Sequence, residues 1–262
     1  MDLDYLNDFF VNVSDRIRFD LCQTVTLDVG NPPGDQSVFK FRHVSYIEVR
    51  DHMNKLKNKT SIDYFNLNNK ILKNVKECIL YPLTDLINKC IDECVFPDNL
   101  KIAKVVPVPK ESNTTDPSKM RPISILPAVS KVFKMILKTQ IIEHFETNNL
   151  FHFGQFGFRS RKSTTDALMY LISKIIDGTE SKEIVGAVFC DLTKAFDCVS
   201  HDLLISKLKC FGFENNSLKL LQSYLSGRTQ YVECGNARSD LKGLKCGVPQ
   251  GSVLGPVLFL LL

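Results

Sequence analysis

An apolar run that ends in an acid constrains this chain more than any other feature. Residues 184–190 read IVGAVFC, and the next residue is Asp191. A short apolar run of this kind predicts a buried β-strand. A carboxylate at the end of such a strand is costly if it is buried without a partner, because desolvation raises the pKa of a carboxyl group by several units. The fold should therefore place something beside Asp191 that keeps it ionised.

Most of the remaining pattern is helical. Apolar residues that recur every three or four positions predict six helices: from Asn66 to about Ile79, from Pro82 to Cys94, over 129–147, from Ser163 through Ile176 to a stop at Gly178, near 201–211, and over 217–225. Pro82 is expected to start the second of these, where its missing N–H is harmless. Ser163 and Asp166 have the spacing of a capping box for the fourth.

A few segments have strand character instead. Residues 101–110 are β-like but contain Pro107 and Pro109, so they are expected at a sheet edge or at the entry to a loop. Residues 229–234 and 241–248 are expected to form a hairpin around GNARSD. Helices that outnumber strands in this way indicate an α+β architecture.

Composition excludes several classes of protein. The 262 residues are 44% apolar and 24% charged, which is ordinary for a globular chain. The first residues are acidic rather than basic and apolar, so no secretory signal is expected, and no run reaches the roughly 18 apolar residues of a membrane span. Nine cysteines without a CxxC pair are interpreted as reduced thiols. These features predict a soluble protein of the cytoplasm or nucleus, without a membrane partner.

The positive charge is concentrated in one block. Residues 101–162 carry 11 Lys and Arg against 4 Asp and Glu, whereas residues 1–100 carry 12 against 15 and residues 163–262 carry 10 against 10. A local excess of this size favours a polyanionic partner, either nucleic acid or nucleotide. The plain alternative is a basic face that is simply solvated.

Five motifs in order carry a resemblance to a known family. They are LKIAKVVPVPK (100–110), KMRPISIL (119–126), FGQFGFRSRKSTTDAL (153–168), FCDLTKAFDCVSH (189–201) and GVPQGSVLGPVLFLLL (247–262). Together they resemble the reverse transcriptases of non-LTR, LINE-type retrotransposons of the jockey and CR1 groups. The resemblance implies polymerase fingers and a partial palm over residues 59–262, with its core over about 90–262. Residues 1–58 are then a leader or linker that docks on the polymerase core.

The resemblance gives Asp191 a role. It implies that Asp191 is the first metal-binding aspartate of the palm, in a site where two Mg²⁺ ions clamp the attacking and leaving oxygens of phosphoryl transfer. The cations themselves would then keep the carboxylate ionised. The alternative is an aspartate that caps the turn into the next helix. Phe196 resembles the aromatic residue that excludes a 2′-hydroxyl and so favours dNTP, with an ordinary core phenylalanine as the alternative. For Asp197, capping or a bond to Lys194 is as plausible as a place near the metal.

Other positions match binding motifs of the family. Arg121 in RPIS, together with Lys110, suits a triphosphate tail, because guanidinium binds phosphate oxygens bidentately and ammonium adds a point charge. Gln250 and Gly251 in PQGS resemble the motif at the nascent base pair, where a residue without Cβ permits close approach. A last group is predicted to contact template phosphates, although a merely basic loop explains them as well: Arg159, Arg161 and Lys162.

The implied partners are an RNA template, a DNA primer and dNTP, but one catalytic element is missing. The family's second catalytic motif is an aromatic-Ala-Asp-Asp hairpin, and no aromatic-x-Asp-Asp occurs in the 262 residues. We therefore expect a chain truncated before that motif and inactive by itself, with only one ligand-bearing strand of the two-ion Mg²⁺ site. A nucleic-acid-binding remnant without catalysis is the second interpretation. The third is an unrelated phosphotransfer or hydrolase fold with Asp191 on the first strand of a parallel sheet.

Overall fold

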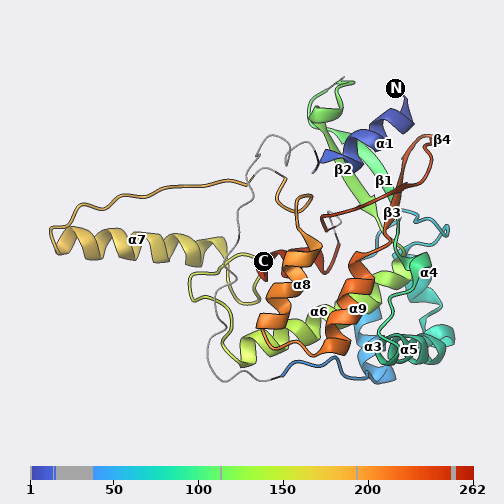
Figure 1. Cartoon of the computed structure of the whole chain (residues 1–262), viewed down its shortest axis with the longest axis horizontal. Coiled ribbons are helices and arrows are strands. Elements are labelled where there is room, and N and C mark those ends of the chain that lie inside the picture. The colour runs from blue at the N-terminus through green and yellow to red at the C-terminus, as the bar shows by residue number, and fades with distance from the viewer. Residues whose placement is uncertain (1, 14, 16–37, 113, 193, 249–251) are drawn as a thin grey trace.

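A computed structural model describes residues 2–13, 15, 38–112, 114–192, 194–248 and 252–262. A helical body lies beside a small twisted sheet, and one long helix projects away from both (Figure 1). The mixed helix and sheet content agrees with the predicted α+β class. No described helix combines the length and the apolar character needed to cross a bilayer.

The helical elements are α1 (Leu3–Val11), α3 (Tyr46–Asn54), α4 (Asn69–Asn74), α5 (Lys76–Asp92), α6 (Ala128–Thr147), α7 (Thr164–Glu180), α8 (His201–Cys210), α9 (Asn215–Leu225) and α10 (Gly255–Leu260), with short 3-10 turns at Asp98–Leu100 and Pro117–Lys119. The helices predicted over 129–147, 201–211 and 217–225 are confirmed as α6, α8 and α9. The capping box of Ser163 and Asp166 is also present, although α7 continues past Gly178 to Glu180.

The prediction that Pro82 starts a helix is wrong. Helix α5 begins at Lys76, directly after a break at Val75, and Pro82 lies inside it. A proline at this position leaves the carbonyl of Cys78 without its usual N–H donor. Both Cys78 and Pro82 are exposed, so water can reach the freed carbonyl. The cost of an interior proline is therefore reduced on this face of the helix.

The sheet is built around β1 (Ile102–Pro109). Strand β2 (Met120–Ile125) pairs with it antiparallel and β3 (Thr229–Cys234) pairs with it parallel, while β4 (Ala237–Arg238) and β5 (Lys242–Gly243) both pair with β3. Of the two positions expected for residues 101–110, the sheet edge is wrong, because β1 is central, whereas the entry to a loop is confirmed, because β1 ends at Pro109 before a loop. Its pairing with β3 covers only Ile102–Val105, however. Pro107 and Pro109 lie beyond that stretch, where a missing N–H breaks no bond to β3.

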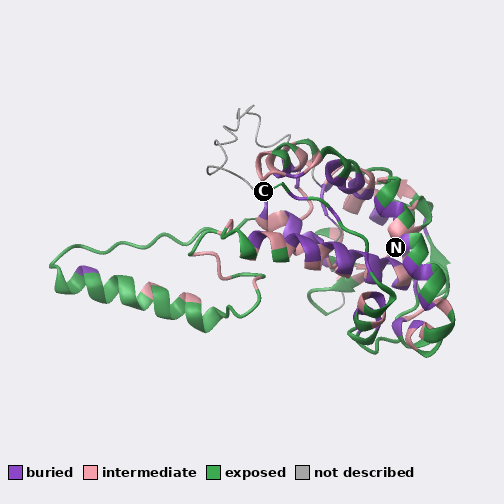
Figure 2. Ribbon diagram, turned by 90° about the horizontal axis from the view of Figure 1, so that it is seen from below, coloured by how far each residue is buried: buried purple, intermediate pink, exposed green. Residues whose placement is uncertain are grey.

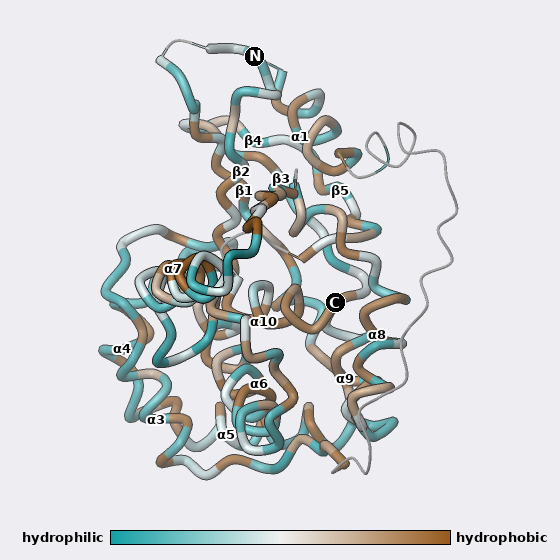
Figure 3. Tube along the Cα trace, turned by 90° about the vertical axis from the view of Figure 1, so that its left-hand side faces the viewer, coloured by the Kyte–Doolittle hydropathy of each residue, from teal (hydrophilic) through white to brown (hydrophobic). Residues whose placement is uncertain are grey.

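The main hydrophobic core lies between the helices. The inner face of α6 supplies Val132, Phe133, Ile136, Leu137 and Ile141, which pack with residues of α3, α5, α9 and α10. Figure 3 shows hydrophobic residues, in brown, along these helices at the end of the molecule away from the sheet. Fully burying one such side chain stabilises the fold by about 1.5–3 kcal/mol.

The predicted strand over 184–190 is not formed. Residues 183–192 run back along α7 without pairing to a strand of the described sheet, and all of them are exposed (Figures 1 and 2). Val188 and Phe189 are 89% and 83% exposed. An apolar run can become a buried strand only when neighbouring strands satisfy its N–H and C=O groups, and no described strand is adjacent to it.

Candidate functional site

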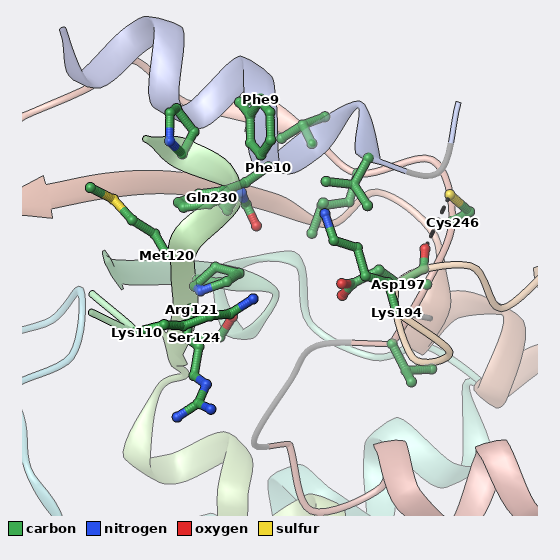
Figure 4. Close-up of a pocket in the computed structure, with 18 residues that line it drawn as sticks. Phe9, Phe10, Lys110, Met120, Arg121, Ser124, Lys194, Asp197, Gln230 and Cys246 are labelled. Atoms are coloured by element: carbon green, nitrogen blue, oxygen red, sulfur yellow. Dashed lines mark hydrogen bonds between the residues drawn. The ribbon is translucent and has the colours of Figure 1, made fainter. Parts of the chain in front are cut away.

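A pocket of about 300 Å³ opens where the sheet meets the segments before α8 and after β5. Helix α1 covers one side of it, β1 and β2 form a second, and the segments that carry Lys194 and Gly247 form a third (Figure 4). The walls thus come from parts of the chain far apart in sequence. Residues of four of the five motifs quoted above line it.

Two predicted binding residues meet in this pocket. Arg121 on β2 lies opposite Val108 on β1, and Lys110 follows β1, its N–H donating to the carbonyl of Lys119 at 2.9 Å. Both residues line the pocket and both are exposed. Neither forms an ion pair with an acid in the described part of the chain. Two available cations in one concave site suit a ligand with several anionic oxygens.

A tight backbone crossing builds the opposite wall. The N–H of Gly247 donates to the carbonyl of Val199 at 2.9 Å, and the N–H of Val248 donates to that of Phe196 at 2.8 Å. Gly247 has φ +80°, and a Cβ there would lie 2.7 Å from the carbonyl oxygen of Asp197. This crossing joins the motif that contains Asp191 to the motif that contains PQGS, and it fixes Asp197 at the pocket.

Gly247→Ala is expected to destabilise the chain by about 1–3 kcal/mol, because alanine is strained at this φ and its Cβ meets backbone that cannot rotate away. Urea denaturation measures the change. Gly243→Ala is the matched control, because a Cβ at Gly243 would have no atom within 4 Å and the backbone there has no positive φ. Equal effects of the two substitutions would show that the crossing does not constrain the fold.

Helix α1 is the part of the pocket that the sequence motifs did not reveal. It lies on β3, where the Asn7 side chain donates to the carbonyls of Gln230 and Asp240 at 3.3 and 2.9 Å. This buried anchor directs Phe9 and Phe10 to the pocket, and the Phe9 ring lies 5.5 Å from Lys194 Nζ. The signal available in the sequence was the apolar face of residues 3–11 after an Asp2 cap.

Asp191 does not line the pocket. It lies on the exposed segment 183–192, outside any described strand. The described residues also contain no group of three or more His, Cys, Asp or Glu side chains that could hold a metal ion. Mg²⁺ prefers several oxygen ligands in octahedral geometry, and Asp191 supplies only one carboxylate. The described residues therefore do not form a complete metal site by themselves.

Phe196 lies behind the pocket rather than in it. It is partly buried, its ring centroid is 4.9 Å from that of Phe259 and 6.1 Å from that of Phe158, and it packs against the main core. Its role beside a sugar stays a prediction. Gln250 and Gly251 lie outside the described residues, so the predicted contact of PQGS with a base pair stays a prediction as well.

The three basic residues of the 153–168 segment have different surroundings. Arg159 Nη2 pairs with Glu146 Oε2 at 2.7 Å, and its guanidinium lies over the Phe151 ring. The hydrogen bonds that Arg159 donates to Glu146 lower the pKa of that carboxyl group. Arg161 and Lys162 are exposed instead, and Lys162 Nζ lies 5.5 Å from the Phe156 ring. Of the three, these two present their charge to solvent.

Comparison with known proteins decides the family. Residues 108–262 match the model described as reverse transcriptase (RNA-dependent DNA polymerase). The chain belongs to the reverse transcriptase family. Its reverse transcriptase domain is of the non-LTR, LINE type, because similar proteins come from such elements.

Three relatives illustrate the similarity. The probable RNA-directed DNA polymerase from transposon BS of Drosophila melanogaster is 32% identical over 235 residues, which are 89% of this chain and 26% of the relative. The probable RNA-directed DNA polymerase from transposon X-element of the same species is 35% identical over 193 residues, which are 71% of this chain and 20% of the relative. The RNA-directed DNA polymerase from mobile element jockey of Drosophila funebris is 30% identical over 217 residues, which are 82% of this chain and 24% of the relative. The matched part of the reverse transcriptase chain thus spans between 20% and 26% of these relatives. Membership in this family also excludes the unrelated hydrolase or phosphotransfer fold.

Proposed function

We propose that this domain acts in template-directed DNA synthesis on RNA, and that the pocket under α1 holds the triphosphate of an incoming dNTP. The observation that carries the proposal is the convergence of Lys110 and Arg121 on one pocket, opposite the crossing at Gly247. A guanidinium and an ammonium suit adjacent phosphate groups. The Asp191 motif and the PQGS motif meet at that crossing, so the wall also joins the segments to which the family resemblance assigns catalysis and base-pair contact.

Asp191 is proposed as one Mg²⁺ ligand of the polymerase. Mg²⁺, when bound, would neutralise the charge that develops on the phosphate oxygens. In this chain Asp191 needs further carboxylates and neighbouring strands around it. We therefore propose that the 262-residue chain alone does not polymerise. Phe196, behind the crossing, would set the back of the sugar site, and Arg161 and Lys162 would contact template phosphates.

Arg121→Ala is expected to weaken binding of dATP by about 10- to 100-fold, the usual worth of a charge-assisted pair of hydrogen bonds. The measurement is a titration of the 262-residue chain with a fluorescent dATP analogue in the presence of Mg²⁺. Lys110→Ala should produce a smaller loss, because its ammonium is a flexible point charge. The control is Lys119→Ala, since Lys119 lies close by but its Nζ pairs with Glu111 at 2.8 Å. If all three variants bind alike, the pocket is not the triphosphate site.

A second candidate is a nucleic-acid-binding module without catalysis. The exposed position of Asp191, away from the pocket, favours it. RNA binding by the chain, together with an absence of dATP binding that depends on Arg121, would support this candidate over the first.

A further inference from the structure

A second cavity adjoins the pocket under α1 at Ser124 on β2. It has a volume of about 410 Å³ and is bounded by the end of α3 and the segment after it, the start of α4, the outer side of α6, and Ser252 and Val253 before α10. Ser124 on β2 lines both cavities. The two sites therefore adjoin, with one residue between them.

The charged side chains described around this second cavity, called the lysine cavity below, are all basic. Its described lining contains no acid and six lysines: Lys55, Lys57, Lys59, Lys131, Lys134 and Lys138. Burial, followed by the charge of Lys55, also lowers the pKa of His52 at the rim. The acid that acts on Lys131 is Asp63, whose oxygens already accept the N–H groups of Phe65, Leu67 and Ala128. A concave surface with this balance attracts anions.

Lys134 lies at the floor of the cavity and is 1% exposed. Its Nζ carries three donors and finds no hydrogen-bond partner among the described residues. Burial, together with the charges of Arg228 and Lys131, lowers the pKa of Lys134 well below its ordinary value. An unpaired cation in such a position is strongly unfavourable unless an anion joins it.

Arg228, behind Lys134, is a second buried basic side chain with unsatisfied hydrogen-bond donors. It is 2% exposed, and only its Nη1 has a described acceptor, the carbonyl of Tyr224 at 3.2 Å. Its Nε and Nη2 find no partner among the described residues. Two buried basic side chains that influence each other, with no described acid between them, leave several strong donors unsatisfied. One oxyanion in the cavity would satisfy the Lys134 donors and reduce the repulsion from Arg228.

The exposed lysines at the edge of the cavity indicate that the anion belongs to a nucleic-acid strand and is not a single ion. Lys55, Lys57 and Lys59 alternate along the exposed segment after α3, while Leu56 between them is buried. All three lysines line the cavity, and the segment turns between them, where the N–H of Lys59 donates to the carbonyl of Lys57 at 2.8 Å. Several exposed ammonium groups around one deep lysine provide more positive charge than a single phosphate needs, and this suits the successive phosphates of a polynucleotide. The adjoining position beside the pocket under α1 agrees with this.

We propose that the lysine cavity binds a backbone phosphate of single-stranded RNA, with Lys134 at its floor and Lys131 and Lys138 at its sides. The choice of RNA rests on the proposed function, whereas the affinity for phosphate rests on the cavity alone. The ammonium groups recognise only the charge of the phosphate, so the contact is independent of base sequence. It would hold the strand next to the nucleotide pocket.

The first test uses inorganic phosphate and the 262-residue chain. Phosphate, compared with chloride at equal ionic strength, should raise the melting temperature of the wild type, because a ligand that binds only the folded state stabilises it. Lys134→Met should abolish most of this phosphate-dependent rise. Lys219→Met removes an exposed lysine of α9 and should leave the rise intact. A wild type that phosphate does not stabilise, or a Lys134→Met variant with the same rise, would overturn the proposal.

The second test uses a fluorescently labelled oligouridine. The double variant Lys131→Gln and Lys138→Gln changes only partly buried side chains, so it should fold, and it should bind the RNA about tenfold more weakly. The slope of log affinity against log salt should fall by about 0.7 for each phosphate that no longer meets a lysine. Lys219→Gln should match the wild type. Stabilisation by phosphate with unchanged RNA affinity in the double variant would mean that the cavity takes a free phosphate, and would overturn the assignment to RNA.

The two proposals fail separately. Arg121→Ala tests the nucleotide pocket and does not touch the lysine cavity. If dATP binding depends on Arg121 but RNA binding is independent of Lys131 and Lys138, only the lysine-cavity proposal fails. If RNA binding depends on those lysines while dATP binding ignores Arg121, the cavity proposal holds and the nucleotide pocket fails.

Discussion

Lys134→Glu is expected to raise the free energy of unfolding of this chain by about 3 kcal/mol in phosphate-free buffer. The wild type buries the Lys134 amine and the Arg228 guanidinium with no described acid between them. Glutamate on the same turn of α6 would supply the carboxylate that Arg228 lacks and would remove the repulsion. The carboxylate would also occupy the lysine cavity, so phosphate should no longer stabilise the variant.

Urea denaturation measures the gain, and a double-mutant cycle assigns it. Lys134→Met removes the repulsion but leaves Arg228 unpaired, so its gain should be smaller. In an Arg228→Met background the advantage of glutamate over methionine should disappear, because the new partner is gone. Destabilisation by Lys134→Glu in the presence of Arg228 would contradict the account of two buried basic side chains with unsatisfied donors.

The burial of Lys134 should also make the free energy of unfolding depend on pH. Because the pKa of Lys134 is lowered in the folded chain, the unfolded chain binds more protons between that lowered pKa and about 10.4. The free energy of unfolding should therefore rise with pH through that window, by at most about 1.4 kcal/mol per pH unit from this group. The groups that act on Lys134 are the charges of Arg228 and Lys131. The difference between the wild type and Lys134→Met isolates the contribution of Lys134.

Local patterns in the sequence were sufficient for several elements. The apolar stripe of α6, the Ser163 capping box and the strand β3 all depend on residues close together in the chain. The sequence also named Lys110 and Arg121, because their motifs are short and contiguous. That they meet in one pocket follows from the pairing of β1 with β2, which the separate motifs did not predict.

The failures have a common physical origin in distant partners. The run over 184–190 has strand composition, yet a strand needs neighbours that satisfy its backbone, and none lies beside it among the described residues. Whether Pro82 starts a helix or lies inside one depends on which face of the helix meets water. The crossing at Gly247 and the cover of α1 over the pocket join segments far apart in sequence. Lys134 appeared only as one charge of the basic block, because its burial follows from the packing of α6.

The second large effect concerns Asp191. In a polymerase polypeptide that contains this domain, Asp191→Asn is expected to lower the rate of primer extension by on the order of 10³-fold, because a neutral amide is a poor ligand for Mg²⁺ and cannot offset its charge. In line with the proposal that Asp191 needs further carboxylates around it, we expect the 262-residue chain to show no extension with either residue. Asp202→Asn is the matched control, because Asp202 is an exposed acid in the first turn of α8.

Primer extension on an RNA template by a polymerase polypeptide that contains this domain, with Asp191→Asn compared with Asp202→Asn, tests the central claim most directly. We predict that incorporation of dNTP is lost in Asp191→Asn and kept in Asp202→Asn. Incorporation by Asp191→Asn at the rate of the wild type would contradict the claim that this domain catalyses polymerisation through Asp191.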